Sequence, residues 1–160
     1  MGDFILRAID REDRNWVAQF LDDHWGSTRV VSRGQAYLAH LLPGFVAIED
    51  DEHVGLITYR LDAEDCEIVT LDSLRENEGI GSALIEAVRE VAVAESCTRL
   101  WLITTNDNLN ALRFYQKRGF RLVAVYPSAL DDSRKIKPEI PLYGKDGIPL
   151  RDEIELELPL

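Results

Sequence analysis

Two stretches of the sequence contain residues whose types and spacing could do chemistry. In the first, Leu71–Leu84, an apolar run ends, a short loop follows, and Gly79-Ile80-Gly81 opens an amphipathic helix. Glycines at a helix start let the backbone approach a ligand, and the first N–H groups of a helix have no partner within it. Because the helix dipole adds positive charge there, this pattern predicts a site for a phosphate or pyrophosphate group.

The glycine pair alone is also consistent with simple turn chemistry, and it differs from two common phosphate motifs. No Gly-Lys-Ser/Thr follows it, which argues against a Walker loop. Leu84 stands where a dinucleotide-binding fingerprint would have its third glycine. The antiparallel strands expected before the glycines further disfavour a nucleotide-binding domain.

The second stretch, residues 104–120, spans another junction between a strand and a helix. An asparagine at such a junction can cap the helix, and a glycine after two cations can end it in the left-handed conformation. We therefore expect a helix over Asn108–Arg118, ended by Gly119.

The spacing of apolar residues predicts the elements that must position these stretches. Three apolar or alternating runs with short acidic turns, Phe45–Glu49, Val54–Leu61 and Cys66–Leu74, are typical of an antiparallel meander. Asp10 reads as a helix N-cap, and Asp13 favours the positive end of that helix. The other expected elements are strands over Phe4–Ile9, Leu100–Thr104, Arg121–Tyr126 and Ile154–Leu158, a helix from Ile80, and a short helix around Gln35–Leu42.

The resulting order, β-α-(α)-β-β-β-α-β-α-β-β, predicts a mixed α/β fold whose sheet is antiparallel at the start and crossed over by helices later. With 160 residues, 46% of them hydrophobic and 29% charged, the chain suits a single globular domain over residues 1–160. The connection between Pro127 and Asp152 is rich in proline and glycine. We expect it to be a long loop with a functional role.

Composition also limits the cellular setting and the partners. No apolar run approaches the ~18 residues of a membrane span, and the N-terminus lacks a signal-peptide pattern. Cys66 and Cys97 have no metal-ligand spacing, so we expect no metal and two reduced thiols in a cytoplasmic protein. The net charge of −11 argues against a nucleic acid or an anionic membrane as partner and is compatible with a cationic substrate.

The pairing of the two stretches resembles the GNAT superfamily of acyl-CoA-dependent N-acetyltransferases. Gly79 and Gly81 match the glycines of its Gln/Arg-x-x-Gly-x-Gly/Ala loop. Its Asn-x-x-Ala-x-x-x-Tyr-x-x-x-Gly-Phe element matches at Asn108, Ala111, Tyr115, Gly119 and Phe120. The resemblance covers Phe45–Tyr126 well and Phe4–Trp25 by pattern only.

One departure concerns charge in the glycine loop. Glu76 stands at the Gln/Arg position, and Glu78 follows where a basic or small residue is usual. Two carboxylates facing a pyrophosphate would repel it. Arg75, one position earlier, could supply the missing cation. Arg134, Lys135 and Lys137 could contact the CoA 3′-phosphate or an acidic group of the acceptor, or they could be a solvated charge run.

The resemblance implies a GNAT fold, with a largely antiparallel sheet of about six or seven strands and about four flanking helices. It also implies that acetyl-CoA binds where two parallel strands, Cys66–Leu74 and Leu100–Thr105, splay apart. The cofactor-binding residues that it implies are Leu71, Ser73, Asn77, Glu78, Gly79, Ile80, Gly81, Ser82, Asn108, Ala111 and Tyr115.

The chemistry implied by the resemblance is direct attack of an amine on the thioester. The backbone N–H near Leu71 is the expected donor to the oxyanion, and Tyr115 is the expected acid for the leaving thiolate, with ring packing as the alternative. Glu67 is the expected base because it shares strand parity with Leu71 and lies in an apolar run where burial would raise its pKa. A solvent-facing edge carboxylate is the alternative interpretation of Glu67, and deprotonation of the amine through water would also serve.

The expected function is N-acetylation of a primary amine, with several alternatives open. The acceptor could be a small molecule or a protein or peptide amine, and a module that binds acyl-CoA without catalysis would show the same motifs. His24 and Trp25 fit either an acceptor pocket or core packing, while His40 and His53 are expected at the surface. Monomer and homodimer are both left open.

Overall fold

The structure is a computed structural model that describes residues 3–76 and 78–160. It is a mixed α/β protein with a seven-stranded, mostly antiparallel sheet, and four α-helices are found among the described residues, so the predicted fold class is confirmed. The chain divides into two compact units. The first unit is Met1–Val30, Leu38–Leu100 and Leu160, and the second is Val31–Tyr37 and Trp101–Pro159. The single domain expected from composition stays a prediction.

The first unit contains the predicted antiparallel meander. Its strands follow the order β1-β4-β5-β6, and each of these neighbouring pairs is antiparallel. Short turns join the last three strands, because the acidic residues between the apolar runs adopt tight turns; Asp50 and Asp51 both have positive φ. The strands are β1 (Ile5–Ala8), β4 (Gly44–Glu49), β5 (Glu52–Asp62) and β6 (Asp65–Ser73).

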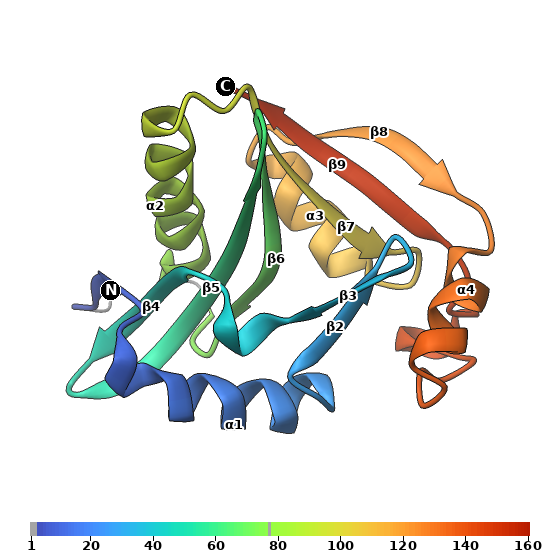
Figure 1. The fold of residues 1–160 in the computed structure, drawn as a ribbon, viewed down its shortest axis with the longest axis horizontal. Coiled ribbons are helices and arrows are strands. Elements are labelled where there is room, and N and C mark those ends of the chain that lie inside the picture. Colours follow the sequence, from blue (N-terminus) through green and yellow to red (C-terminus); the bar gives the residue numbers. More distant parts are fainter. Residues whose placement is uncertain (1–2, 77) are drawn as a thin grey trace. The chain divides into compact units, whose positions relative to one another are not determined.

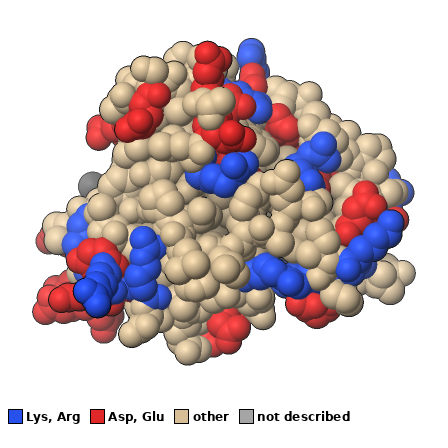
Figure 2. Space-filling view, viewed as in Figure 1, with Lys and Arg blue, Asp and Glu red and all other residues tan. Residues whose placement is uncertain are grey.

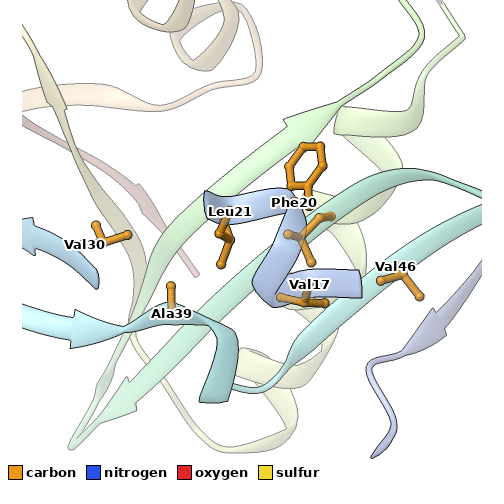
Figure 3. Close-up of a cluster of buried hydrophobic side chains, with 7 residues drawn as sticks. Val17, Phe20, Leu21, Val30, Ala39 and Val46 are labelled. Atoms are coloured by element: carbon orange, nitrogen blue, oxygen red, sulfur yellow. The ribbon is translucent and has the colours of Figure 1, made fainter. Parts of the chain in front are cut away.

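Helix α1 (Arg14–Trp25) packs on one face of this meander. The predicted cap is confirmed: the side chain of Asp10 accepts from Glu12 N and Asp13 N, and Asp13 completes a capping box at the short 3-10 turn η1 (Arg11–Asp13). The apolar stripe of α1 is buried against strand residues of the same face, as Figure 3 shows. The buried cluster consists of Val17, Phe20, Leu21, Val30, Ala39, Val46 and Leu56.

Helix α2 (Ile80–Ala94) packs against the opposite face of the meander (Figure 1). Gly55 of β5 explains how closely it approaches. A Cβ at this position would lie 2.6 Å from Ile80 Cγ2 and 3.1 Å from Leu84 Cδ1. The helix starts immediately after the loop that follows β6, so its N-terminus lies beside the end of that strand.

The short helix predicted around Gln35–Leu42 is wrong. The chain instead forms a two-stranded sheet from β2 (Arg29–Ser32) and β3 (Gln35–Leu38), followed by the 3-10 turn η2 (Ala39–Leu41). Arg33 has a φ of 51° and Gly34 a φ of 72°. Two successive residues of positive φ make a tight hairpin turn, and this local geometry overrides the weak helical pattern.

The second unit holds the later strands and helices. The start of β7 (Arg99–Thr105) still belongs to the first unit, and the strand continues into the second. Helix α3 (Leu109–Lys117) follows and ends before Gly119, whose φ of 94° confirms the predicted left-handed position. Strands β8 (Arg121–Tyr126) and β9 (Glu153–Pro159) pair antiparallel, with Val123 as a bulge.

The predicted long loop between Pro127 and Asp152 is also wrong in part, because it contains helix α4 (Ala129–Ile136) and the turn η3 (Lys145–Gly147). Leu130 N–H donates to Arg151 O at 3.0 Å, which ties the start of α4 to the residues before β9. Arg134 donates to the carbonyls of Ile140, Pro141 and Leu150. These contacts join distant residues, so local sequence patterns give no sign of them. None of the helices formed by the described residues is long and apolar enough to cross a membrane.

Candidate active site

The end of β6 presents backbone groups away from β5. Leu74 N–H donates to Val54 O at 2.9 Å, and the register then pairs Ser73 with Gly55, Asp72 with Leu56 and Leu71 with Ile57. Hydrogen-bonded and non-hydrogen-bonded pairs alternate in an antiparallel ladder. Leu71 and Ser73 are therefore non-hydrogen-bonded positions toward β5, and their N–H and C=O groups point to the other edge of β6.

A β-bulge at Val69 changes which face each residue of β6 occupies. Thr58 pairs with Thr70 and Tyr59 pairs with Ile68, so Val69 has no partner on β5. An inserted residue reverses the alternation of side chains along a strand. Glu67 consequently lies on the face that carries α1, whereas Leu71 lies on the face that carries α2. The predicted shared parity of Glu67 and Leu71 is wrong for this reason.

Glu67 is buried, with 3% of its surface exposed, so the alternative of a solvent-facing carboxylate is wrong. Its Oε1 lies 3.4 Å from Arg60 Nε, and Arg60 is its partner across the strand pair. On the same face, the hydroxyl oxygens of Thr58 and Thr70 lie 2.6 Å apart and are buried. Glu67, Thr70 and Asp72 thus form a polar row on the α1 face of β6.

The glycine loop has the backbone geometry expected of an anion site. Gly79 is the N-cap of α2 with a φ of 76°, and the first N–H bonded inside the helix is that of Ala83, which donates to Gly79 O at 3.0 Å. The preceding helical N–H groups, those of Ile80, Gly81 and Ser82, lie at the positive end of the helix dipole. Asn77, a predicted cofactor contact, lies outside the described residues.

The charged side chains of this loop differ in their surroundings. Arg75 forms an ion pair with Glu49 and lies 3.6 Å from Glu52, so carboxylates already hold it, and its role as the missing cation stays a prediction. Glu76 is exposed. Glu78 has its Oε2 buried, and no described residue donates a hydrogen bond to that atom. The position at which the family pattern has Gln or Arg therefore carries the exposed carboxylate of Glu76.

Asp72 is a residue of this site that the sequence reasoning missed. Trp25 Nε1–H donates to Asp72 Oδ2 at 3.0 Å, which joins the last residue of α1 to the end of β6. His24 stacks on Phe20 with ring centroids 4.1 Å apart. Burial raises the pKa of Asp72, while the Trp25 hydrogen bond and the charge of His24 oppose the rise. His24 and Trp25 are both exposed, so the alternative of core packing is wrong for both.

In the second unit, Asn108 caps α3 as predicted. Its Oδ1 accepts from Ala111 N at 3.2 Å and from Lys145 Nζ at 3.2 Å. Lys145 N also donates to Asp107 Oδ2 at 3.0 Å, which fixes the η3 segment beside the start of α3. The predicted cofactor contacts of Asn108 and Ala111 remain predictions.

Tyr115 is buried, with 8% of its surface exposed. Phe114 and Phe120 contact its ring edge-on, each with a centroid separation of 5.3 Å. Its backbone oxygen accepts from Arg118 N and Phe120 N at the end of α3. This packing fixes the ring, which both the acid role and the packing role require.

The other residues singled out from the sequence lie in structural contacts. Arg134 binds backbone carbonyls, and Lys135 Nζ lies 3.4 Å from Asp132 Oδ1. His53 is wrongly predicted as a surface residue, since it stacks on Trp16 and bonds to Asp13 Oδ1 at 3.0 Å. His40 is likewise only partly exposed.

The two cysteines of the first unit, Cys66 and Cys97, are free and buried. Burial raises the pKa of the Cys66 thiol to about 12, and it raises that of Cys97 as well. Both are therefore unreactive thiols at neutral pH. Within the described part of the chain, no group of three His, Cys, Asp or Glu residues could hold a metal ion.

Cations and carboxylates lie together on the surface. In the view of Figure 2, Lys and Arg occur in small groups next to Asp and Glu. Arg99 lies 3.3 Å from Asp65, and Arg121 lies 2.8 Å from Glu157. Much of the positive charge is thus already matched by the excess of acidic residues.

The protein is a mixed α/β protein, and its first unit holds a glycine-opened helix beside a strand end whose Leu71 and Ser73 backbone groups point away from β5. A sequence profile of the "Acetyltransferase (GNAT) family" matches residues 9–120. The Bacillus subtilis (strain 168) protein "Uncharacterized protein YdhI" is 46% identical over 142 residues, which cover 88% of this chain and 89% of that protein. The chain therefore belongs to the GNAT acetyltransferase family, and the resemblance inferred from its motifs is confirmed.

Solved structures share the fold. An IAA acetyltransferase from Bacillus cereus ATCC 14579 has a TM-score of 0.74 at 21% identity, covering 99% of this chain and 100% of that one. A GNAT family acetyltransferase from Elizabethkingia anophelis with acetyl-CoA bound has a TM-score of 0.71 at 20% identity, covering 100% of both chains. Arabidopsis thaliana Naa50 in complex with the bisubstrate analogue CoA-Ac-MVNAL has a TM-score of 0.70 at 21% identity, covering 98% of this chain and 99% of that one. At identities this low, these structures show a shared fold and nothing further.

Proposed function

We propose that this protein is an N-acetyltransferase that transfers the acetyl group of acetyl-CoA to a primary amine. The observation that carries the proposal is the direction of the Leu71 and Ser73 backbone groups, which point away from β5 beside the N-terminus of α2. An extended pantetheine arm can pair with such a strand end, and a pyrophosphate suits the helix start. The neighbours solved with acetyl-CoA or a bisubstrate analogue support the same donor.

In the proposed reaction, the neutral amine nitrogen attacks the thioester carbon. The C–N bond forms, the carbonyl oxygen becomes an oxyanion, and the C–S bond then breaks to release the thiolate of CoA. The backbone N–H of Leu71 is the proposed oxyanion donor. Glu67 is the proposed base for the proton that the amine loses, and Tyr115 gives a proton to the thiolate.

Binding of the donor is tested by thermal unfolding with and without acetyl-CoA. A ligand at about 100 times its Kd stabilises the native state by about 2.7 kcal/mol, which corresponds to a rise in Tm of several degrees for a chain of this size. We expect that rise for the wild type. Its absence at saturating acetyl-CoA would contradict the proposal.

The position of the pyrophosphate is tested by Gly81→Asp and Ser82→Asp. Each adds a carboxylate at the α2 N-terminus, where it repels phosphate. Ser82→Asp is the safer of the two for folding, because an acidic residue in the first turn stabilises a helix and Gly81 is buried. Both variants should lose the stabilisation by acetyl-CoA, whereas Ala94→Asp at the far end of α2 should keep it. Retention of full stabilisation in Ser82→Asp would place the phosphates elsewhere.

Catalysis is tested by Tyr115→Phe, which keeps the ring packing and removes the hydroxyl. We expect kcat to fall by about 10²–10⁴, with little change in acetyl-CoA affinity. Tyr143→Phe is the matched control, since Tyr143 belongs to the same unit and is exposed. Wild-type kcat in Tyr115→Phe, with chemistry rate-limiting, would make Tyr115 a packing residue.

The acceptor is found by measuring CoA release against amines, amino acids, polyamines, aminoglycosides and peptides. Turnover with a small amine and not with peptides favours a small-molecule enzyme, and the reverse favours a peptide N-acetyltransferase. Stabilisation by acetyl-CoA without turnover on any acceptor favours a module that binds acyl-CoA without catalysis.

A further inference from the structure

Asp72 connects two elements that are far apart in the sequence. It lies one residue before the end of β6, and its Oδ2 accepts a hydrogen bond from Trp25 Nε1 at 3.0 Å. Trp25 is the last residue of α1, and Gly26 ends that helix with a φ of 75°. Within the described residues, the Trp25 indole is the hydrogen-bond donor found for Asp72. One carboxylate oxygen is thus oriented by the indole, and the second can accept from another donor.

The surroundings of this carboxylate favour a cation. The C-terminus of a helix carries partial negative charge, and α1 ends at Trp25. The Trp25 side chain is exposed, with 38% of its surface accessible, and the N–H edge of its ring points at the carboxylate. Burial raises the pKa of Asp72, and the Trp25 hydrogen bond opposes this rise only in part.

Asp72 is also next to the proposed reaction centre. It follows Leu71 directly, and the backbone N–H of Leu71 points away from β5. Its side chain lies on the α1 face, at the end of the polar row that includes Glu67 and Thr70. A ligand held at Asp72 would therefore lie at the same end of β6 as the thioester in the proposed reaction.

We propose that Asp72 binds the ammonium group of the acceptor, and that Trp25 orients the carboxylate and contacts the carbon chain next to the ammonium. The acceptor is accordingly a primary alkylamine that is cationic in solution. This inference rests on the proposed acetyltransferase function and deepens it. Asp72 is a specificity-determining residue in this account, distinct from the base Glu67. The bound ammonium loses one proton to solvent to become the neutral amine that attacks, and Glu67 takes the second proton after the attack.

The test uses n-butylammonium as the probe, with 1-butanol as its uncharged isostere, both added to the CoA-bound full chain. The readout is the indole ¹⁵N–¹H resonance of Trp25, assigned among the three tryptophans by its loss in Trp25→Phe. In the wild type, n-butylammonium should shift this resonance in a saturable way and 1-butanol should not. No saturable shift with n-butylammonium would overturn the proposal.

Asp72→Asn keeps the size of the side chain and removes its charge. We expect the affinity for n-butylammonium to fall at least about tenfold, because a charge-assisted hydrogen bond is lost. Asp51→Asn is the matched control, since Asp51 lies in the exposed β4–β5 turn at a φ of 64°, a conformation that Asn tolerates. Equal affinity in Asp72→Asn and the wild type would overturn the proposal.

Acetyl-CoA binding separates this inference from the proposed function. If acetyl-CoA fails to raise the wild-type Tm, the proposed function fails. If acetyl-CoA raises the Tm of the wild type and of Asp72→Asn equally while only the ammonium response is lost, both the function and the inference stand. With an amine substrate from the acceptor panel, Asp72→Asn should raise the KM of the amine at least about tenfold and leave the KM of acetyl-CoA unchanged.

Discussion

The two ends of α1 present carboxylates in opposite circumstances. Asp13 directly precedes the helix, and Asp72 meets the indole of its last residue, Trp25. Asp13 is 2% exposed and has several donors: Arg7 Nη2 donates to its Oδ1 at 2.9 Å, Asp10 N to its Oδ2 at 2.9 Å, and His53 Nε2 lies 3.0 Å from Oδ1. For Asp72, the hydrogen-bond donor found among the described residues is the Trp25 indole.

These surroundings move the two carboxyl pKa values in opposite directions. Burial by itself would raise the pKa of Asp13, but the hydrogen bonds from Arg7, Asp10 and His53 outweigh it and hold that pKa well below its usual range. At Asp72 burial prevails over the Trp25 hydrogen bond, and the pKa rises. The helix dipole adds to both effects, since it favours a negative charge at the start of α1 and disfavours one at its end.

The comparison distinguishes a structural carboxylate from one available to a ligand. A charge whose hydrogen-bonding needs are met within the fold stabilises the fold. A charge that is partly buried and incompletely compensated costs stability, and such residues concentrate at functional sites. This difference supports placing the acceptor's ammonium at Asp72 and assigning Asp13 to the cap of α1.

The largest expected effect is on stability at Asp13. Asp13→Ala removes the capping box, leaves the Asp10 N–H without its acceptor and removes the hydrogen bonds from Arg7 to Asp13, so we expect a loss of roughly 2–4 kcal/mol in the free energy of unfolding. Urea denaturation measures it. Glu12→Ala in the same 3-10 turn is the control, because Glu12 is exposed and should change stability by less than about 0.5 kcal/mol. Equal losses of stability in Asp13→Ala and Glu12→Ala would show that Asp13 is not a special structural carboxylate.

The next effect is a pair of opposite pH dependences. The pKa of Asp13 is lowered in the folded state, so its contribution to stability is present above its usual pKa of about 4 and is lost as the pH falls below that value. The pKa of Asp72 is raised, so the folded protein keeps the carboxyl proton of Asp72 up to a higher pH than the unfolded chain does. Stability from Asp72, beside His24 and Trp25, therefore falls as the pH rises from its usual value through the raised one.

Denaturation of the wild type, Asp13→Asn and Asp72→Asn from about pH 3 to pH 7 measures both pH dependences of stability. The stability advantage of the wild type over Asp13→Asn should grow as the pH rises. The difference between the wild type and Asp72→Asn should move in the opposite direction. Parallel trends would show that the two carboxylates are equivalent.

The smallest expected effect is the stability of Asp72→Asn at neutral pH. Removing an incompletely compensated charge should leave the free energy of unfolding within about 0.5 kcal/mol of the wild type or raise it. Chemical denaturation without ligand measures it. A loss as large as that in Asp13→Ala would show that Asp72 is a structural residue, and it would contradict the proposal that Asp72 binds the acceptor.

Most of the fold was predictable because its signals are local. The acidic turns and apolar runs of the meander, the caps at Asp10 and Asn108, and the position of Gly119 each depend on a few neighbouring residues, and the structure confirms all of them. The pairing of the glycine loop with the Tyr115 element was enough to indicate the family. The hairpin at Arg33-Gly34 and helix α4 were missed because both are short, and α4 is held by contacts to distant residues.

The site depended on tertiary structure in two respects. A single inserted residue, Val69, moves Glu67 and Leu71 to opposite faces of the sheet. Because side chains alternate with a period of two, no pattern that assumes a regular strand can detect this change. Asp72 gained its importance only when the fold brought Trp25 within hydrogen-bond distance of it.

The sequence by itself determined the order of the elements, the glycine-opened helix and the family, since these follow from local conformational preferences and a short motif. The tertiary structure alone decided which carboxylates are satisfied. Asp13 and Asp72 are the same residue type beside the same helix, yet their charges are compensated differently. The physical reason is that a carboxyl pKa depends on burial and on donors such as Arg7, His53 and Trp25, which only the folded chain assembles around it.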